Sequence, residues 1–219
     1  GGRLRIGELP FKAQPLAKPS EDELHLAMLN GIRDKGLSVL NWTPAAEQLR
    51  LRLHCAAKWL PEYDWPAVVG RTLLGTPHMS DVHSLRGLKS LDVHQALSGL
   101  LNYSLQQRLV SSLPTHYTVP TGSRIAIRYH EDNPPALAVR MQEMFGEAKT
   151  PTIAEGRVPL VLELLSPAQR PLQITQDLAA FWQGSYHDVQ KEMKGRYPKH
   201  VWPDDPANTA PTRRTKKYS

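Results

Sequence analysis

The sequence predicts an α+β protein, in which a helical N-terminal half is followed by a small sheet with a long C-terminal helix. Three observations on hydrophobic spacing predict this fold. Apolar residues recur at helical spacing as far as Pro114. From Tyr117 they alternate with polar residues, which is typical of half-buried strands. The helical spacing returns after Thr175 and continues to Met193.

The composition predicts a soluble protein with one or two domains. The chain has 219 residues, of which 40% are apolar, and this is enough for a real core. No apolar run is long enough to span a bilayer, so no membrane partner is expected. Residues 1–11 carry charges without a long apolar stretch, so no signal peptide is expected there. Cys55 is the only cysteine and lies among apolar residues. We expect a buried, unreactive thiol in a reducing compartment, the cytoplasm.

Residues 1–19 are predicted to form a terminal strand, because residues 3–6 alternate charged and apolar side chains. A helical region is predicted over residues 20–115. Its first helix begins at Ser20, since Ser20 and Glu23 form a capping box. Gly36 is predicted to end this helix, because glycine readily adopts the left-handed conformation of a helix C-terminus.

The next helix is predicted to begin at Thr43 and Pro44, which fit the N-cap and the first helical position. Pro61 is predicted to end it. An apolar stripe at helical spacing marks its inner face, with basic residues mostly outside. The stripe is Leu49, Leu53, Ala56 and Leu60, and the basic residues are Arg50, Arg52 and Lys58.

Residues 62–77 resemble a linker, because they contain two prolines and two glycines. Residues 84–91 are predicted to form a short helix or turn. Asp92 is then predicted to cap one further helix that continues through Leu109. Pro114 closes the helical half.

Residues 116–206 are predicted to form an α+β domain. Strands are predicted over residues 117–119, 124–130, 157–165 and 172–174. A helix is predicted by composition over residues 137–145. Thr175 is predicted to cap the long last helix, which Gly195 ends. Residues 207–219 form a basic tail, which is expected to be extended or disordered because it is poor in apolar residues.

Residues 195–206, which we call the strap, combine cations, aromatic rings and prolines. Pro198, Pro203 and Pro206 exclude a continuing helix, because each lacks an N–H and restricts the residue before it. Such a strap is suited to grip a phosphate backbone, with cations supplying charge and rings supplying stacking. In the alternative interpretation, Tyr197 and Trp202 anchor the strap on its own domain.

The net charge of +6 is concentrated at the C-terminal end. The last 29 residues hold eight Lys or Arg side chains against three acidic ones, whereas the rest of the chain is close to neutral. This distribution predicts an anionic partner, such as single-stranded RNA or another nucleic acid. The predicted nucleic-acid-binding residues are Lys191, Lys194, Arg196, Tyr197, Lys199, His200, Trp202, Arg213, Arg214, Lys216 and Lys217.

No catalytic, cofactor or metal site is predicted. Residues 70–76 hold the two glycines of a phosphate loop, but Thr76 stands where the lysine belongs. His78, His83 and His94 do not have metal-ligand spacing. The acidic residues are scattered, and none pair on one face as general acid–base chemistry requires.

Three stretches carry a specific resemblance. They are residues 118–146 (TVPTGSRIAIRYHEDNPPALAVRMQEMFG), 156–182 (GRVPLVLELLSPAQRPLQITQDLAAFW) and 194–206 (KGRYPKHVWPDDP). They resemble the C-terminal region of the HrpB family, which are bacterial ATP-dependent helicases of the DEAH/RHA type. Residues 15–24 and 33–42 extend the resemblance upstream.

The resemblance implies a C-terminal piece of such a helicase. The Walker loop and the DEAH-type box of the family belong to an N-terminal part, so its catalytic residues have no counterparts in these 219 residues. The strand at residues 3–6 would then be the end of an OB-like barrel. Residues 68–76 depart from the family pattern, because the corresponding segment is usually longer.

Two functions of different classes follow. In the first, the chain is a non-catalytic accessory region that holds RNA near the helicase core of its parent chain. In the second, it is a protein-docking and scaffolding region, whose helical half receives a protein partner. A salt-dependent affinity for single-stranded RNA would favour the first, and co-purification with a partner at high salt would favour the second.

Overall fold

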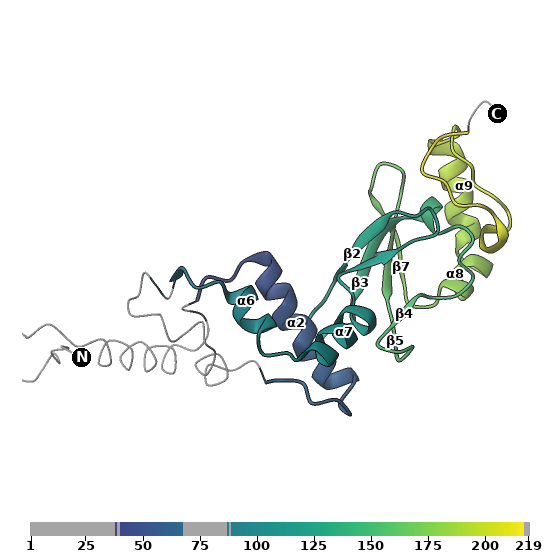
Figure 1. The fold of residues 1–219 in the computed structure, drawn as a ribbon. Helices are drawn as coiled ribbons and strands as arrows, with labels where there is room; N and C mark the ends of the chain where they lie inside the picture. Colours follow the sequence, from purple (N-terminus) through teal and green to yellow (C-terminus); the bar gives the residue numbers. More distant parts are fainter. Residues whose placement is uncertain (1–37, 39, 68–86, 88, 217–219) are drawn as a thin grey trace, which may run out of the picture. The chain divides into compact units, whose positions relative to one another are not determined.

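The computed structural model describes residues 38, 40–67, 87 and 89–216, and it confirms an α+β protein (Figure 1). Residues 55–63 and 107–216 form one compact unit, and the other described residues belong to a second. Within these described residues, no helix has the length and apolar character needed to cross a membrane. The predicted strand at 3–6, the helix from Ser20 and the segment 68–76 lie outside them. The domain boundaries 1–19, 20–115, 116–206 and 207–219 remain predictions.

Helix α2, Pro44–Trp59, begins at the predicted residue. The Thr43 hydroxyl accepts a hydrogen bond from the backbone N–H of Ala46 at 3.1 Å. This bond satisfies one of the free donors in the first turn. The predicted apolar stripe is buried, and its members are Leu49, Leu53, Ala56 and Leu60.

Two other residues of α2 are also buried. Arg52 is only 7% exposed, so the prediction that it lies outside was wrong. The reason is its position three residues after Leu49 and four before Ala56, which places it on their face of the helix. Cys55 is buried, as predicted, and its thiol lies 3.2 Å from the carbonyl oxygen of His130. Burial raises the pKa of Cys55 to about 11, which keeps the thiol protonated and unreactive.

The helix predicted from Asp92 through Leu109 is in fact two helices, α6 (Val93–Ser98) and α7 (Tyr103–Ser112). Asp92 caps α6, as predicted. The break arises because Asn102 accepts a hydrogen bond from the backbone N–H of Leu105 at 2.8 Å. Asn102 therefore begins a new helix, since an asparagine side chain bonds the first turn more readily than it continues a helix.

Five strands form the main sheet in the order β1-β2-β3-β6-β7, and two short strands, β4 and β5, form a separate pair. The strands are β1 (His116–Thr118), β2 (Arg124–Arg128), β3 (Ala136–Arg140), β4 (Thr152–Ile153), β5 (Val158–Pro159), β6 (Val161–Leu165) and β7 (Pro171–Thr175). β3 and β6 run parallel, and all the other pairs are antiparallel. The strands predicted over residues 117–119, 124–130 and 172–174 correspond to β1, β2 and β7. The single strand predicted over residues 157–165 is in fact two strands, β5 and β6, which belong to different sheets.

The predicted helix over residues 137–145 was wrong. These residues form β3 and a 3-10 turn, η2 (Met141–Met144). β3 lies between β2 and β6, so its backbone groups are paired on both sides, and Leu137 and Val139 are buried. A central strand buried in this way has no polar–apolar alternation, which made its composition resemble that of a helix.

The sheet has one buried face and one open face. Ile127 of β2, Leu137 of β3 and Leu162 of β6 are at most 1% exposed and lie on the buried face. Arg128 of β2 and Ile174 of β7 belong to the opposite face and are exposed. The predicted alternation of β2 and β6 is therefore confirmed, because it separates core residues from solvent-facing ones.

The predicted long last helix is divided into α8 (Leu178–Gln183) and α9 (Tyr186–Arg196). Asp177 caps α8 in place of Thr175. Gly184 ends α8, because its N–H bonds to two carbonyls of the last turn at 3.0 and 3.2 Å. A Cβ at this position would lie 3.1 Å from a backbone oxygen of α8, so the close turn favours glycine.

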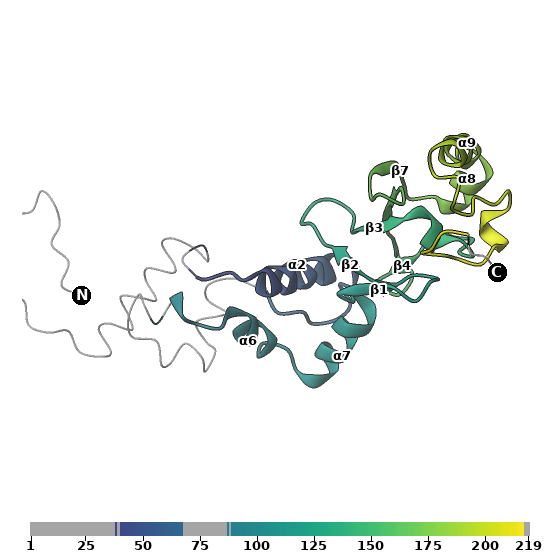
Figure 2. The same ribbon diagram turned by 90° about the horizontal axis from the view of Figure 1, so that it is seen from above.

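Helices α8 and α9 and the chain beyond them gather at one end of the sheet (Figures 1 and 2). Five aromatic rings from this part of the chain contact one another. We call Phe145, Phe181, Trp182, Tyr186 and Trp202 the aromatic cluster. The ring of Phe145 lies 6.0 Å from that of Trp182 and 6.5 Å from those of Tyr186 and Trp202. These tilted and edge-on contacts are the arrangements that aromatic pairs prefer.

The polar ends of the cluster bond to the strap. The Tyr186 hydroxyl donates to the carbonyl of Pro203 at 2.6 Å, and the Trp202 indole donates to the carbonyl of Tyr197 at 2.9 Å. The side-chain amide of Gln190, on α9, donates to the carbonyl of Trp202 at 3.0 Å. The strap is therefore fixed to α9 by both apolar contacts and hydrogen bonds.

We expect Trp202→Ala to lower the free energy of unfolding by roughly 3–5 kcal/mol, the usual cost of emptying a buried aromatic site. Trp202 is only 5% exposed, so the substitution leaves a cavity beside Phe145. Urea denaturation followed by circular dichroism measures the change. The control is Tyr103→Ala, because Tyr103 is 76% exposed. Equal stability of the two variants would contradict a buried anchor at Trp202.

Candidate nucleic-acid interface

The basic tail lies along the strap as far as it is described. The backbone N–H of Lys216 donates to the carbonyl of Lys199 at 2.5 Å, and that of Thr212 donates to the carbonyl of Gln142 at 3.1 Å. A short 3-10 turn, η3 (Pro206–Asn208), begins this course. Residues 209–216 lie outside any helix or strand, with bends at residues 209, 213 and 214.

The contact between tail and strap joins two segments that hold five of the predicted binding residues. We call Arg196, Lys199, Arg213, Arg214 and Lys216 the basic patch, and all five are exposed. Two come from the end of α9 and the strap, and three come from the tail. Because the Lys216–Lys199 bond joins the two segments, positive charges up to 20 positions apart in sequence contribute to one local field.

Two predicted cations have acidic neighbours. Lys194 lies 4.0 Å from Asp204, and Arg196 lies 3.4 Å from Glu192. All four side chains are more than half exposed, so these pairs contribute little and are readily exchanged for a phosphate. Lys191, on α9, is exposed as well.

The predicted aromatic residues separate into an anchor and two partly accessible rings. Trp202 is buried, which favours the alternative that it anchors the strap. Tyr197 and His200 are half-buried, and their rings lie 6.3 Å apart in a T-shaped arrangement. The remaining predicted residue, Lys217, lies outside the described residues.

A further arginine, which no sequence pattern indicated, lies beside the patch. Arg140, at the end of β3, donates to Glu143 at 3.2 Å, and the hydroxyls of Thr121 and Ser123 donate to the same carboxylate at 2.8 and 2.7 Å. Arg213 of the basic patch donates to the Ser123 hydroxyl at 3.1 Å. Burial alone would raise the pKa of Glu143, but these hydrogen bonds outweigh it and hold the pKa below the usual value. The tail is thus attached to a charged network that no local sequence pattern reveals.

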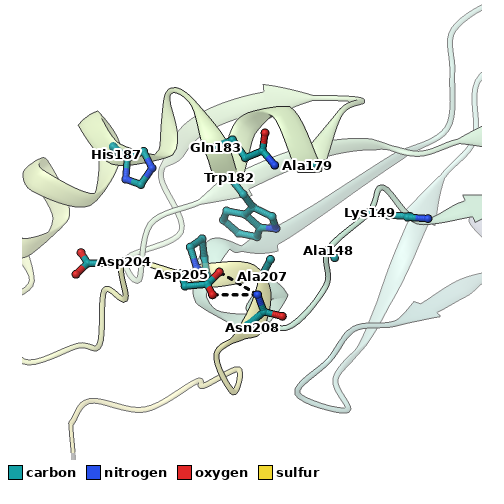
Figure 3. Close-up of a pocket in the computed structure, with 11 residues that line it drawn as sticks. Ala148, Lys149, Ala179, Trp182, Gln183, His187, Asp204, Asp205, Ala207 and Asn208 are labelled. Atoms are coloured by element: carbon teal, nitrogen blue, oxygen red, sulfur yellow. Dashed lines mark hydrogen bonds between the residues drawn. The ribbon is translucent and has the colours of Figure 1, made fainter.

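The same compact unit also contains a pocket of about 540 Å³ beside α8, α9 and η3, with the Trp182 indole in its middle (Figure 3). Asn208 donates to both carboxylate oxygens of Asp205, at 2.9 and 3.2 Å. Asp204 and Asp205 line the pocket against a single lysine, Lys149. This pocket is therefore less suited to phosphate than the basic patch. Among the described residues, no group of three His, Cys, Asp or Glu side chains is placed to hold a metal ion.

His200 connects the strap to this network. Burial lowers its pKa, and the positive charge of Arg140 lowers it further, while a hydrogen bond with the backbone of Arg214 opposes both effects. Its Nδ1 atom is buried and has no hydrogen-bond partner among the described residues. The folded protein therefore favours the neutral imidazole.

We expect the stability of the protein to fall as the pH is lowered from about 7.5 to about 5.5, through the ordinary pKa range of histidine. Since the pKa of His200 is lower in the folded state, the unfolded chain binds the proton first, and this favours unfolding. His200→Gln should lose less stability over the same interval, measured by urea denaturation at both pH values. Equal losses in the two proteins would contradict a neutral imidazole at His200.

Known proteins resemble this chain closely. The family described as ATP-dependent helicase C-terminal (HrpB_C) matches residues 75–206. The ATP-dependent RNA helicase HrpB of Escherichia coli K12 is 81% identical over 223 residues, which cover 99% of this chain and 28% of the helicase. The chain therefore spans less than a third of the length of this relative.

Two solved structures have the same fold. The crystal structure of the E. coli DExH-box NTPase HrpB superposes with a TM-score of 0.85 at 82% identity, covering 92% of this chain and 26% of that one. A second crystal structure, of the Escherichia coli DEAH/RHA helicase HrpB, gives a TM-score of 0.72 at 78% identity, covering 91% and 26%. The chain thus belongs to the HrpB family, as its ATP-dependent helicase C-terminal region.

Proposed function

We propose that this chain is a non-catalytic accessory region of an ATP-dependent RNA helicase, and that it holds single-stranded RNA near the motor of the parent protein. The observation that carries the proposal is the basic patch, in which the tail lies on the strap through the Lys216–Lys199 backbone bond. The E. coli relative is named an RNA helicase, which makes RNA the first anion to test. A cytoplasmic location belongs to the same proposal.

The physics of the patch supports binding to a phosphate backbone. Each lysine or arginine that contacts a phosphate releases a condensed counterion into bulk solution. The entropy gained by the released ions favours binding. The prolines of the strap and the backbone bonds of the tail fix the course of both segments before any ligand arrives. The entropic cost of ordering the strap and the tail therefore arises mainly on folding and does not arise again on binding.

The proposal of no catalysis rests on the sequence. Residues 70–76 have a threonine where a phosphate loop has its lysine, and no acidic motif for magnesium follows. In the family, the motor motifs belong to an N-terminal part. ATP turnover would then be a property of the parent protein.

A docking role is the second candidate, and one observation favours it. β7 is an edge strand of the five-stranded sheet, and its Ile174 is 64% exposed. An edge strand with an exposed apolar side chain is able to pair with an extended segment of a partner protein. This role would not require the basic patch.

Changing Arg196 and Lys199 together to alanine should weaken binding to a short single-stranded RNA. The plot of log affinity against log salt should become shallower by about 1.4, because two phosphate contacts are lost at about 0.7 each for single strands. Fluorescence anisotropy with a labelled oligonucleotide at several salt concentrations gives the slope.

A double variant of Lys89 and Arg170 to alanine is the matched control. Both residues are exposed, and the pair removes the same charge outside the basic patch. Its salt slope should equal that of the unchanged protein. An unchanged slope in the Arg196 and Lys199 variant, with folding intact, would remove the patch from the RNA site and favour the docking role.

The purified chain should hydrolyse no ATP, with or without RNA, because it lacks the residues that position phosphates and magnesium. A coupled phosphate-release assay measures this. The full-length parent helicase is the positive control. Turnover that co-elutes with the chain through successive purification steps would contradict the non-catalytic assignment.

A further inference from the structure

A second pocket, of about 360 Å³, lies at the end of α2 within the same compact unit as the basic patch. Its walls come from the end of α2, the turn before β3, β5 and the residue after β7. The lining residues are Lys58, Trp59, Asp132, Asn133, Pro134, Arg157, Val158, Pro159 and Gln176. None of these residues was predicted to bind nucleic acid.

Trp59 supplies the only aromatic ring among these lining residues. Its indole is half-buried, and its centroid lies 6.5 Å from that of Tyr129 in the core. The Arg157 guanidinium donates to the backbone carbonyl of Trp59 at 2.8 Å, which holds the end of α2 in place. The ring is therefore positioned before any ligand arrives, with part of its surface left accessible.

The cations of the pocket are held by neighbouring groups. Lys58 Nζ lies 5.9 Å from the centroid of the Trp59 ring and donates to the carbonyl of Glu131 at 2.6 Å. Arg157 pairs with Glu62 at 2.8 Å. With Asp132 also lining the pocket, the local charges nearly cancel. A nearly neutral site is poorly suited to bind a phosphate but well suited to a neutral planar group.

The polar groups around the Trp59 ring include both hydrogen-bond donors and hydrogen-bond acceptors. Lys58 and Arg157 are donors only, Asp132 is an acceptor, and the amides of Asn133 and Gln176 are both. A nucleobase presents donors and acceptors along its edge and an apolar face on each side. Unpaired bases in RNA are commonly held by stacking on aromatic rings, with their edges bonded to polar side chains.

We propose that this pocket binds one unstacked base of a single-stranded RNA, with the base stacked against Trp59 and its edge bonded by the polar side chains of the rim. The inference rests on the proposed function, because it assumes that RNA is bound by this unit. It adds a contact to the base, whereas the basic patch contacts only phosphates. Proline-rich peptides also dock in aromatic grooves. The pocket has a single indole and two prolines, Pro134 and Pro159, among its lining residues, which favours a flat base instead.

The first test compares Trp59→Leu with Trp59→Phe in the 219-residue chain, using anisotropy of a labelled 12-nucleotide single-stranded RNA. We expect Trp59→Leu to bind about 5- to 150-fold more weakly, the range measured for one stacked base. Trp59→Phe should retain most of the affinity, because it keeps an aromatic ring. The salt slope should be unchanged in both variants, because no phosphate contact is lost.

The matched control is Trp42→Leu, since Trp42 is also half-exposed but does not line the pocket. It should bind RNA as tightly as the unchanged protein. Circular dichroism verifies that each variant is folded. Wild-type affinity in folded Trp59→Leu overturns the inference, and so does a loss of equal size in Trp42→Leu.

The second test does not depend on a variant folding. A 12-nucleotide ribose-phosphate strand without bases should bind the unchanged protein more weakly than the RNA does, at the same salt slope. If Trp59→Leu has folded, it should bind the two strands with a smaller difference. Equal affinity of the unchanged protein for both strands overturns the inference, as does a polyproline decamer that competes with RNA at this pocket.

The two proposals fail in different ways. In one case, the Arg196 and Lys199 variant has a shallower salt slope than the unchanged protein, but Trp59→Leu binds RNA as tightly as the unchanged protein does. That result retains the proposed function and rules out the base pocket. An absence of salt-dependent RNA binding in the unchanged protein removes both.

Discussion

The C-terminal part of this protein depends on the burial of one ring, Phe145. It is fully buried and contacts three other rings of the aromatic cluster, which come from α8, α9 and the strap. Phe145 directly follows η2, which continues the central strand β3. Through this ring, the strap packs against a residue whose position is set by the sheet. Without it, Tyr186 of α9 and Trp202 of the strap would lose the ring that both of them contact.

The tail depends on the residue that follows this ring. Gly146 has φ +93°, a conformation that favours glycine, and its N–H donates to the carbonyl of Pro206 at 2.9 Å. A Cβ at Gly146 would lie 3.3 Å from the carbonyl oxygen of Thr209, so a side chain there would crowd the tail. The basic patch is consequently built on a close backbone contact, and its charges are brought together by folding rather than by adjacency in sequence.

Local signals predicted the parts of the fold that local physics decides. Thr43 and Asp92 cap helices, and alternation identified β2 and β6, because these features act within a few residues. The wrong predictions concern segments whose secondary structure depends on contacts with residues distant in sequence. β3 is a strand because β2 and β6 pair with it, although its composition favours a helix. The breaks at Asn102 and Gly184 were missed because apolar spacing continues across both.

The same distinction applies to the candidate site. Charge counting found the cations of the patch, since charge is a property of composition, but it could not find Arg140 or the Trp59 pocket. Those sites join residues 20 to 98 positions apart, such as Ser123 with Glu143 and Trp59 with Arg157.

The basic patch and the Trp59 pocket also differ in the physics of binding. An exposed patch with an excess of positive charge gives long-range attraction that salt screens, whereas a pocket with balanced charges and one ring discriminates only at contact. A strand held by both would be attracted by its phosphates and fixed in register by its bases, which is the division of roles that phosphate and base contacts have in nucleic-acid recognition.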